Sequence, residues 1–282
     1  MKKIMAAGVL ALSLLSASAQ TLRIATYNMR YDNPKDTLDR WQKRLPVIVS
    51  LVRFYDFDVM GGQELLNNQV NDLTQQLPEY DHVGVGRDDG KDKGEFSAVF
   101  FKKDRFKLLK SGTFWLSDTP DSPSKGWDAA LPRICSWVFL EDKASGFKFY
   151  AFNTHFDHRG VIARKESGRL IAEKIQKIAG DTPAVLTGDL NFDEHHEGYA
   201  SILASGKLKS TYDLASIRMA NGGTFNSFNV NSTAEQRIDH IFVTSAFSVK
   251  RYGILTDSYR GRFPSDHFPI MVELSAEKKG KK

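Results

Sequence analysis

The sequence predicts a single α/β domain, a sandwich of helices and largely antiparallel strands, and three observations support this. A chain of 282 residues with ordinary apolar content is long enough for one large core. No Pro-, Gly- or Ser-rich linker divides it, and no repeat of 20–50 residues is visible. Strand-like segments are mixed with helical ones, and four of them follow one another with no long helix between them, which is typical of antiparallel pairing.

Residues 1–19 have the pattern of a secretory signal peptide. Two lysines precede an apolar run over residues 4–15, and small residues follow. The run is too short to span a bilayer, although a buried N-terminal helix is the alternative interpretation. We therefore expect cleavage before Gln20 and a bacterial protein exported to the periplasm or outside the cell. The single cysteine, Cys135, lies in an apolar segment, so we expect no internal disulfide.

The first part of the domain alternates strands and helices. Residues 22–30 read as a strand that ends in polar residues. Residues 44–55 read as a helix with Pro46 near its start or at a kink. Residues 57–64 form a short buried strand, and residues 65–77 have helical spacing.

The rest of the domain is richer in strands. An amphipathic helix is expected over 164–179, where apolar residues share one side. Two long loops, 84–96 and 117–133, are of the kind that is often functional on a compact domain. The expected strands cover residues 96–103, 106–116, 134–142, 147–156, 183–191, 237–244 and 267–275.

The formal net charge of +5 suggests a nucleic-acid-binding protein, but its distribution does not. The two lysines of the signal segment, together with four lysines and one glutamate in the tail at 277–282, account for all five charges. The domain itself, 20–276, is therefore formally neutral, whereas proteins that bind nucleic acid regardless of sequence usually present a basic surface. The tail reads as a solvated end.

Five compact clusters of polar residues lie where predicted strands end or begin. A buried strand that stops at such a residue carries it to the rim of a sheet on a rigid support. Each cluster alone has a simpler explanation, as a turn, a helix start, strand alternation or a satisfied structural aspartate. Together they suggest one shared pocket. The clusters contain Asn28; Glu64; Asn153, His155, Asp157 and His158; Asp189 and Asn191; and Asp239 with Asp266 and His267.

At these residues the chain resembles the endonuclease/exonuclease/phosphatase superfamily, whose fold is shared by DNase I and the CCR4/nocturnin exonucleases. The resemblance runs from "ATYNMR" at 25–30 to "SDHFPI" at 265–270, with the motifs in the family's order. The segment 111–140 is similar to a subgroup of exported bacterial members. The resemblance implies a four-layer α/β/β/α sandwich, in which two mostly antiparallel sheets are flanked by helices and open at one edge to form the site.

The resemblance also implies roles for individual residues. Glu64 matches the principal metal ligand, with Asn28 beside it and the acidic Asp266 near the metal. Asp189 and Asn191 match the pair that handles the nucleophilic water and a phosphate oxygen. The remaining three matches are His155 as a phosphate-contacting histidine, His267 as the catalytic histidine and Asp239 as the carboxylate that orients it.

The chemistry of these residue types agrees with those roles. A hard divalent cation held by a few carboxylates offsets the charge of a phosphoester and leaves positions for water and phosphate. Magnesium suits such oxygen ligands and manganese can replace it, whereas the ligand spacings typical of zinc are absent from the sequence. A histidine paired with Asp239 stays protonated more readily and can stabilise charge on the phosphate.

Other residues have two interpretations each. Arg133 either contacts phosphate or is a plain surface arginine. His158 either lines the pocket or caps a strand. Trp115, Trp127 and Phe225 either stack a base or sugar face or belong to the core.

The expected function is phosphoester hydrolysis by metal-assisted in-line attack of water. The first hypothesis is an exported phosphodiesterase or nuclease acting on RNA or DNA. The alternative substrate is a small or lipid phosphoester, such as an inositol phosphate, a sugar phosphate or a phospholipid head group. A binding module without activity would have lost the metal- and water-handling residues, which are all present. We expect a monomer with no protein partner and no stable membrane insertion; fold alone does not choose the substrate.

Overall fold

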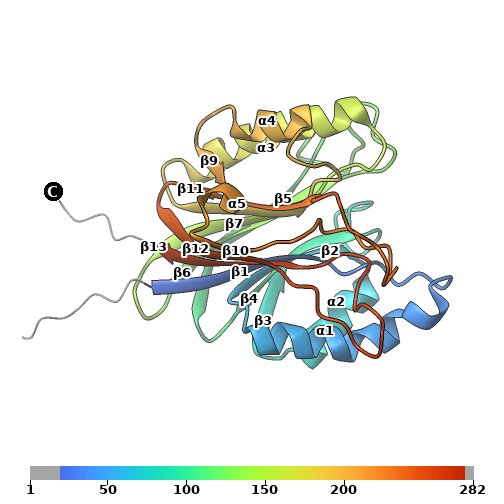
Figure 1. Ribbon diagram of the computed structural model, residues 1–282. Helices are drawn as coiled ribbons and strands as arrows, with labels where there is room; N and C mark the ends of the chain where they lie inside the picture. Colours follow the sequence, from blue (N-terminus) through green and yellow to red (C-terminus); the bar gives the residue numbers. More distant parts are fainter. Residues whose placement is uncertain (1–19, 277–282) are drawn as a thin grey trace, which may run out of the picture.

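The computed structural model describes residues 20–276, so the predicted signal segment 1–19 and basic tail 277–282 lie outside the described residues. Two β-sheets lie face to face between two layers of helices (Figure 1). This is the predicted four-layer α/β/β/α sandwich. Within residues 20–276, no helix is long and apolar enough to cross a membrane.

The first sheet has seven strands in the order β10-β12-β13-β1-β2-β4-β3. Its pairs are antiparallel except β1 with β2 and β10 with β12. Its strands are β1 (Gln20–Asn28), β2 (Val59–Leu65), β3 (Tyr80–Val83), β4 (Phe96–Lys102), β10 (Ile217–Met219), β12 (Phe247–Ile254) and β13 (Ile270–Ala276).

The second sheet has six strands in the order β5-β6-β7-β8-β11-β9. Only β7 and β8 pair in parallel, so both sheets are mostly antiparallel, as predicted. Its strands are β5 (Phe106–Trp115), β6 (Ile134–Asp142), β7 (Lys148–His155), β8 (Ala184–Asp189), β9 (Leu208–Ser210) and β11 (Asp239–Thr244).

Helices cover the outer face of each sheet. Helices α1 (Trp41–Tyr55) and α2 (Asn67–Gln76) pack on the seven-stranded sheet. Helices α3 (Val161–Ala179) and α4 (Glu197–Leu203) pack on the six-stranded sheet. The short η1 (Thr37–Asp39) and α5 (Thr211–Leu214) complete the helices of the described chain.

Alternation along the strands divides the apolar residues among three cores. In β1, Leu22 and Ile24 face the other sheet and join its strands in the central core. Ala25 and Tyr27 belong to the core beneath α1 and α2. Because a strand presents successive side chains to opposite faces, one strand serves two layers. All these residues are buried, and burial of apolar surface is the main source of folding free energy.

The predicted elements all occur, with boundaries displaced by a few residues. Helix α1 begins at Trp41 rather than residue 44, so Pro46 lies inside it. Strand β12 was not predicted, because Lys250 and Arg251 interrupt its apolar alternation. The pairing of β12 with β13 shifts register between Val249 and Arg251, which places this interruption at a β-bulge.

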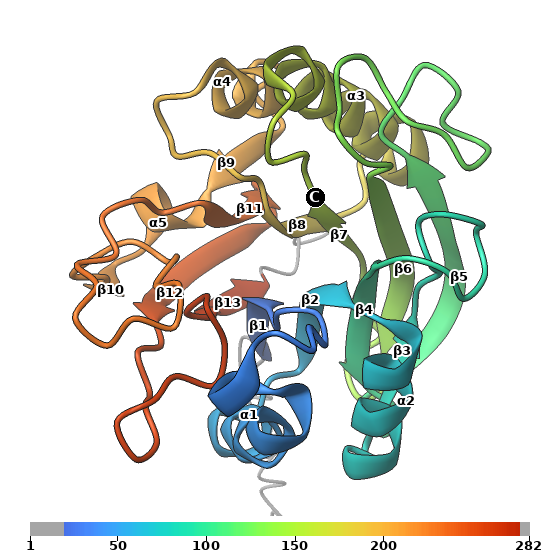
Figure 2. The ribbon, with the colours of Figure 1, turned by 90° about the vertical axis from the view of Figure 1, so that its right-hand side faces the viewer.

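The polar strand ends meet at one edge of the sandwich. The parallel pairs β1–β2 and β7–β8 both direct their carboxyl ends to this edge, and the two pairs lie close together in the centre of Figure 2. Strand β11 begins there, because Asp239 pairs with Asp189 at the end of β8. Gln20 pairs with Ala276 at the other end of β1, so the ends of the described chain lie at the opposite edge.

A buried polar contact joins the two sheets just below this edge. Gln63 of β2 donates a hydrogen bond to Asn153 Oδ1 of β7 (2.6 Å), and Thr187 of β8 donates to the same oxygen (3.0 Å). The Asn153 amide donates in turn to the carbonyls of Gly62 and Ala98 in the first sheet. Asn153 is thus a structural link, which fixes the spacing of the strands that carry the site.

Gly61 gives the first testable prediction, because a Cβ at this position would overlap the Asn153 amide and the Thr187 hydroxyl. Gly61→Ala should lower the free energy of unfolding by about 3 kcal/mol, the cost of overpacking a core. Gly253→Ala in β12 is the matched control, because its Cβ would meet only Leu255 at 3.7 Å. Urea unfolding measures both variants, and equal effects would contradict the proposed constraint.

Candidate active site

A cavity of about 760 Å³ opens at the edge where the strand ends meet. Eight of the ten predicted site residues line it, and the other two, Asn28 and Asp239, are buried beside them. The eight are Glu64, Arg133, His155, His158, Asp189, Asn191, Asp266 and His267.

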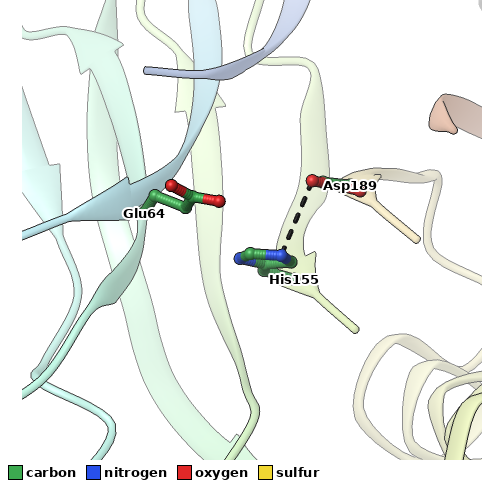
Figure 3. Close-up of side chains that lie close together, drawn as sticks. All are labelled: Glu64, His155 and Asp189. Carbon is green, nitrogen blue, oxygen red and sulfur yellow. Dashed lines mark ion pairs between the residues drawn. The ribbon is translucent and has the colours of Figure 1, made fainter. Parts of the chain in front are cut away.

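Asp189 lies at the centre of this group. Its Oδ2 accepts a hydrogen bond from Asn28 Nδ2 (2.8 Å) and lies 3.5 Å from His155 Nε2 and 3.8 Å from His267 Nε2. Asn28 Nδ2 also donates to Glu64 Oε1 (3.1 Å). Figure 3 shows Glu64 from one sheet pointing toward His155 and Asp189 of the other. The two sheets therefore contribute to a single site.

Glu64 is aimed into the cavity by an irregularity in β2. Its backbone has φ +61°, and the pairing of β2 with β4 shifts register between Gly62 and Leu65. A bulge of this kind redirects a side chain, and a positive φ is unfavourable for a residue other than glycine. The carboxylate is held by Asn28 and by the backbone N–H of Tyr31, which donates to Oε2 (3.2 Å).

His267 is held between Asp239 and the loop that precedes β13. Its Nδ1 lies 2.9 Å from Asp239 Oδ2, so Nε2 faces the cavity and Asp189. Burial alone would lower the pKa of His267, but Asp239 and Asp189 outweigh it and raise the pKa well above its usual value. This geometry favours the protonated imidazole.

The pKa of His155 is shifted in the opposite direction to that of His267. Burial, reinforced by the cations Arg133 and Arg87, lowers its pKa well below the usual value, so the ring is neutral. Asn191 Nδ2 lies 3.0 Å from His155 Nε2. Because an amide nitrogen only donates, Nε2 accepts and the ring proton is on Nδ1, which faces Glu95 Oε2 at 3.8 Å.

The site carboxylates are crowded and only partly compensated. Burial and the neighbouring Asp239 raise the pKa of Asp189, despite the opposing effect of His267. Burial also raises the pKa of Asp266, and the charge of Glu64 adds to this increase. The site therefore carries excess negative charge that a cation would offset.

Arg133 is buried, with 4% of its surface exposed, so its interpretation as a surface arginine is wrong. Its Nη2 lies 3.1 Å from His158 Nδ1, whereas its Nε and Nη1 make no hydrogen bond with any described residue. Nη1 lies 3.9 Å from Glu95, which Arg87 also contacts (2.5 Å). Burial and the charge of Arg87 lower the pKa of Arg133.

The loop at 84–96 supplies Arg87 and Glu95, which sequence reasoning missed. Its length and charge were noted, but no strand pattern placed these two residues at the site. Of the three aromatic candidates, Phe225 lines the cavity with 42% of its surface exposed. Its ring meets that of His267 edge-on at 5.0 Å. Trp115 is buried and donates to the Arg87 carbonyl, and Trp127 does not line the cavity.

Arg30 and Asp36 also line the cavity and were not predicted. They belong to the segment that follows β1. The buried side chain of Arg44 holds this segment by hydrogen bonds. Arg44 is fully buried and donates to the carbonyls of Met29 (2.6 Å), Arg30 (3.0 Å) and Asp39 (2.7 Å). It also donates to the Pro264 carbonyl (3.0 Å), next to the loop that carries Asp266 and His267.

The residues at this edge fit a hard divalent cation. Ligand atoms of Glu64, His155 and Asp189 lie within 4.8 Å of one another, as do those of Asp189, Asp239 and His267. The carboxylates of Glu64, Asp189 and Asp266 supply oxygen, the ligand that magnesium and manganese prefer. Asn28 turns its amide N–H toward these carboxylates, while its oxygen accepts from the backbone of Arg30 (3.0 Å). Its role as a metal ligand stays a prediction.

Comparison with known proteins agrees with the motifs. The model of the endonuclease/exonuclease/phosphatase family matches residues 25–267. An endonuclease/exonuclease/phosphatase family protein from Bacteroides thetaiotaomicron is 50% identical, with a TM-score of 0.89 over 92% of this chain and 99% of that one.

Two further structures bear on the site. The mannosyl-6-phosphatase Bt3783 of Bacteroides thetaiotaomicron is 50% identical, with a TM-score of 0.87 over 90% of this chain and 99% of that one. The catalytic domain of human Nocturnin is 20% identical, with a TM-score of 0.73 over 91% and 94% of the two chains. The likeness to Nocturnin shows a shared fold.

The two donors that hold the Glu64 carboxylate predict the response to Glu64→Gln. Glutamine has one acceptor oxygen, so either Asn28 Nδ2 or the Tyr31 N–H would face its NH₂ group. Without metal the variant should therefore be less stable than the wild type by about 1 kcal/mol, a Tm decrease of about 2–4 °C. Added magnesium should raise its Tm less than that of the wild type, because a ligand has been lost. Thermal unfolding in EDTA and in magnesium measures both effects. Glu79→Gln, at an exposed ion pair with Arg53, is the control; an equal or larger rise in Tm on addition of magnesium to Glu64→Gln would contradict the prediction.

Proposed function

This chain belongs to the endonuclease/exonuclease/phosphatase family, and we propose that it is a divalent-metal-dependent phosphatase that hydrolyses the phosphomonoester of a sugar phosphate. The observation that carries the chemistry is the position of Asp189 Oδ2, between His155 Nε2 (3.5 Å) and His267 Nε2 (3.8 Å). The choice of a sugar phosphate is supported by the 50% identity to a mannosyl-6-phosphatase over nearly the whole chain.

The metal would be held by Glu64 with Asp266, which both line the cavity. When bound, a divalent cation offsets the charge of the phosphate and favours attack by water. Burial is the main cause of the raised pKa values of Asp189 and Asp266, and a neighbouring carboxylate adds to each, Asp239 for Asp189 and Glu64 for Asp266. A bound cation would offset the charge of these neighbours. Magnesium is the proposed ion, and manganese is an alternative of the same ligand preference.

The side chains of the cavity provide the remaining chemistry. Asp189 orients the attacking water and accepts its proton. The water oxygen forms a bond to phosphorus while the bond from phosphorus to the sugar oxygen breaks. The sugar oxygen takes up a proton from solvent and leaves as the alcohol, and Asp189 returns its proton to solvent. Protonated His267 stabilises the charge that develops. Both side-chain N–H groups of Asn191 already donate, to His155 Nε2 and to the Phe156 carbonyl (3.0 Å each), so donation to a phosphoryl oxygen would require one of these hydrogen bonds to open.

We assign recognition of the substrate phosphate to the part of the cavity wall that contains Arg133, His155 and His158. Within residues 20–276, Arg133 Nε and Nη1 make no hydrogen bond, although they lie 3.6 Å from Asp157 Oδ2 and 3.9 Å from Glu95 Oε2. Arg133 lines the same cavity as His155 and His158. A dianionic phosphomonoester carries one more charge than a diester, and a buried guanidinium can bind two of its oxygens at once. The cavity of about 760 Å³ falls within the range of small-molecule sites.

A nuclease is the second candidate, and the neutral charge of residues 20–276 counts against it. Export through the segment 1–19 to the periplasm or outside, and a monomeric state, also remain proposals that rest on sequence pattern alone.

A substrate screen tests the function. Phosphate release from hexose 6-phosphates and inositol phosphates is compared with hydrolysis of a simple diester and of RNA and DNA, each with magnesium, manganese or EDTA. We expect metal-dependent release from a sugar phosphate, and a loss of at least about a hundredfold in kcat for His267→Ala. His195→Ala is the control, because His195 is exposed and does not line the cavity. Cleavage of nucleic acid alone would favour the second candidate, and full activity of His267→Ala would refute the assigned chemistry.

The pairing of His267 with Asp239 predicts a pH effect. Activity requires the protonated imidazole and is lost as the pH rises through its pKa, which Asp239 raises. Asp239→Asn removes that charge, so the pKa falls and the alkaline loss of kcat/KM should begin at lower pH. A pH–rate profile of the variant with an unchanged or higher alkaline limit would contradict the role of Asp239.

A further inference from the structure

Arg30 places a fixed positive charge against the predicted metal ligands. Its Nη1 lies 3.6 Å from Asp266 Oδ2 and 4.0 Å from Glu64 Oε2, beyond hydrogen-bond distance but within reach of strong attraction. We propose that Arg30 is an internal counter-ion of the metal site, which stabilises the metal-free protein and weakens its affinity for the divalent cation. This inference rests on the proposed metal dependence.

The surroundings of Arg30 hold the guanidinium in this position. Asp36 accepts hydrogen bonds from its Nε (3.1 Å) and Nη2 (3.3 Å), so Nη1 is the nitrogen that faces the carboxylates. The guanidinium also lies over the ring of Tyr31, 4.6 Å from its centre. A fork held on one side and stacked on a ring has little freedom to leave.

The backbone of Arg30 is fixed as well. It adopts φ +56°, which is unfavourable for a residue other than glycine. Its N–H donates to Asn28 Oδ1 (3.0 Å), and its carbonyl accepts from Arg44 (3.0 Å) and Gln69 (2.9 Å). Three hydrogen bonds thus maintain a conformation that directs the side chain toward the site.

The electrostatic consequence has two parts. Without metal, Arg30 offsets the repulsion between Glu64 and Asp266, which share this corner of the cavity. A divalent cation bound by the same carboxylates is repelled by Arg30, even if the guanidinium moves partly aside. The same charge therefore supports the metal-free state and opposes the metal-bound one, as linkage requires.

Arg30 is therefore a positioning residue whose removal has opposite effects on stability and metal binding. In Arg30→Gln, the Tm in EDTA should fall, whereas Mn²⁺ should bind at least about tenfold more tightly. Arg30→Lys retains the charge and should bind Mn²⁺ within about threefold of the wild type. Arg53→Gln is the matched control, because Arg53 makes the same fork with Glu79, through Nε (2.8 Å) and Nη2 (3.3 Å), and lies outside the cavity.

Calorimetric titration with Mn²⁺ alone measures the affinities, so no substrate or turnover enters the test. Equal or weaker binding by Arg30→Gln overturns the inference and leaves the proposed function standing. A wild type that binds neither Mn²⁺ nor Mg²⁺ refutes the metal dependence, and the inference falls with it.

A second measurement covers the case in which Arg30→Gln does not fold. In the wild type, the side-chain ¹⁵N signals of Arg30, assigned with Arg30→Lys, should shift on addition of Mg²⁺, while those of Arg53 should not. An Arg30 signal that does not move at saturating Mg²⁺ overturns the inference.

Discussion

Repulsion between buried carboxylates is the constraint on which the organisation of this site depends. Glu64, Asp189, Asp239 and Asp266 converge at one edge, and each has a partner of opposite or neutral character. Asn28 donates to two of these carboxylates, and protonated His267 lies between two of them. The balance remains incomplete, and this incompleteness makes the edge suitable for a cation and a phosphate.

The backbone at this edge adopts unfavourable φ angles at residues that carry site groups. Arg30, Glu64 and Asn191 all have positive φ. The backbone N–H groups of Arg30 and Asn191 donate to Asn28 and Asp189, and the Glu64 carboxylate accepts from the Tyr31 N–H. Strain of this kind persists where the surrounding structure over-determines it, and it is often found at functional sites. Below the edge, Asn153 and Gln63 tie the two sheets together, so the strained segments rest on a rigid base.

Local pattern predicted an α/β sandwich with mostly antiparallel strands and the polar residues at strand ends, whereas the four layers were implied by the resemblance to the family. A strand of alternating or continuous apolar residues that ends in Asn28, Glu64 or Asp189 reveals where its last side chain goes. The loops have no such periodicity, so Arg87 and Glu95 were missed although their loop was recognised. Arg30 and Asp36 were missed for a related reason: their position depends on a left-handed turn and on Arg44, fourteen residues after Arg30. Arg133 was recognised, but only the structure shows that it is buried.

The hydrogen bonds of Arg44 couple the local unfolding of two segments of the site. One side chain is bonded to the chain leaving β1 and to the chain entering β13, and its own charge persists at any ordinary pH. Arg44 thus joins two segments of the site by hydrogen bonds. One segment carries Asn28 and Arg30, and the other carries Asp266 and His267. Local opening on either side would release both, so the acidic and imidazole halves of the centre should be gained and lost as one cooperative unit.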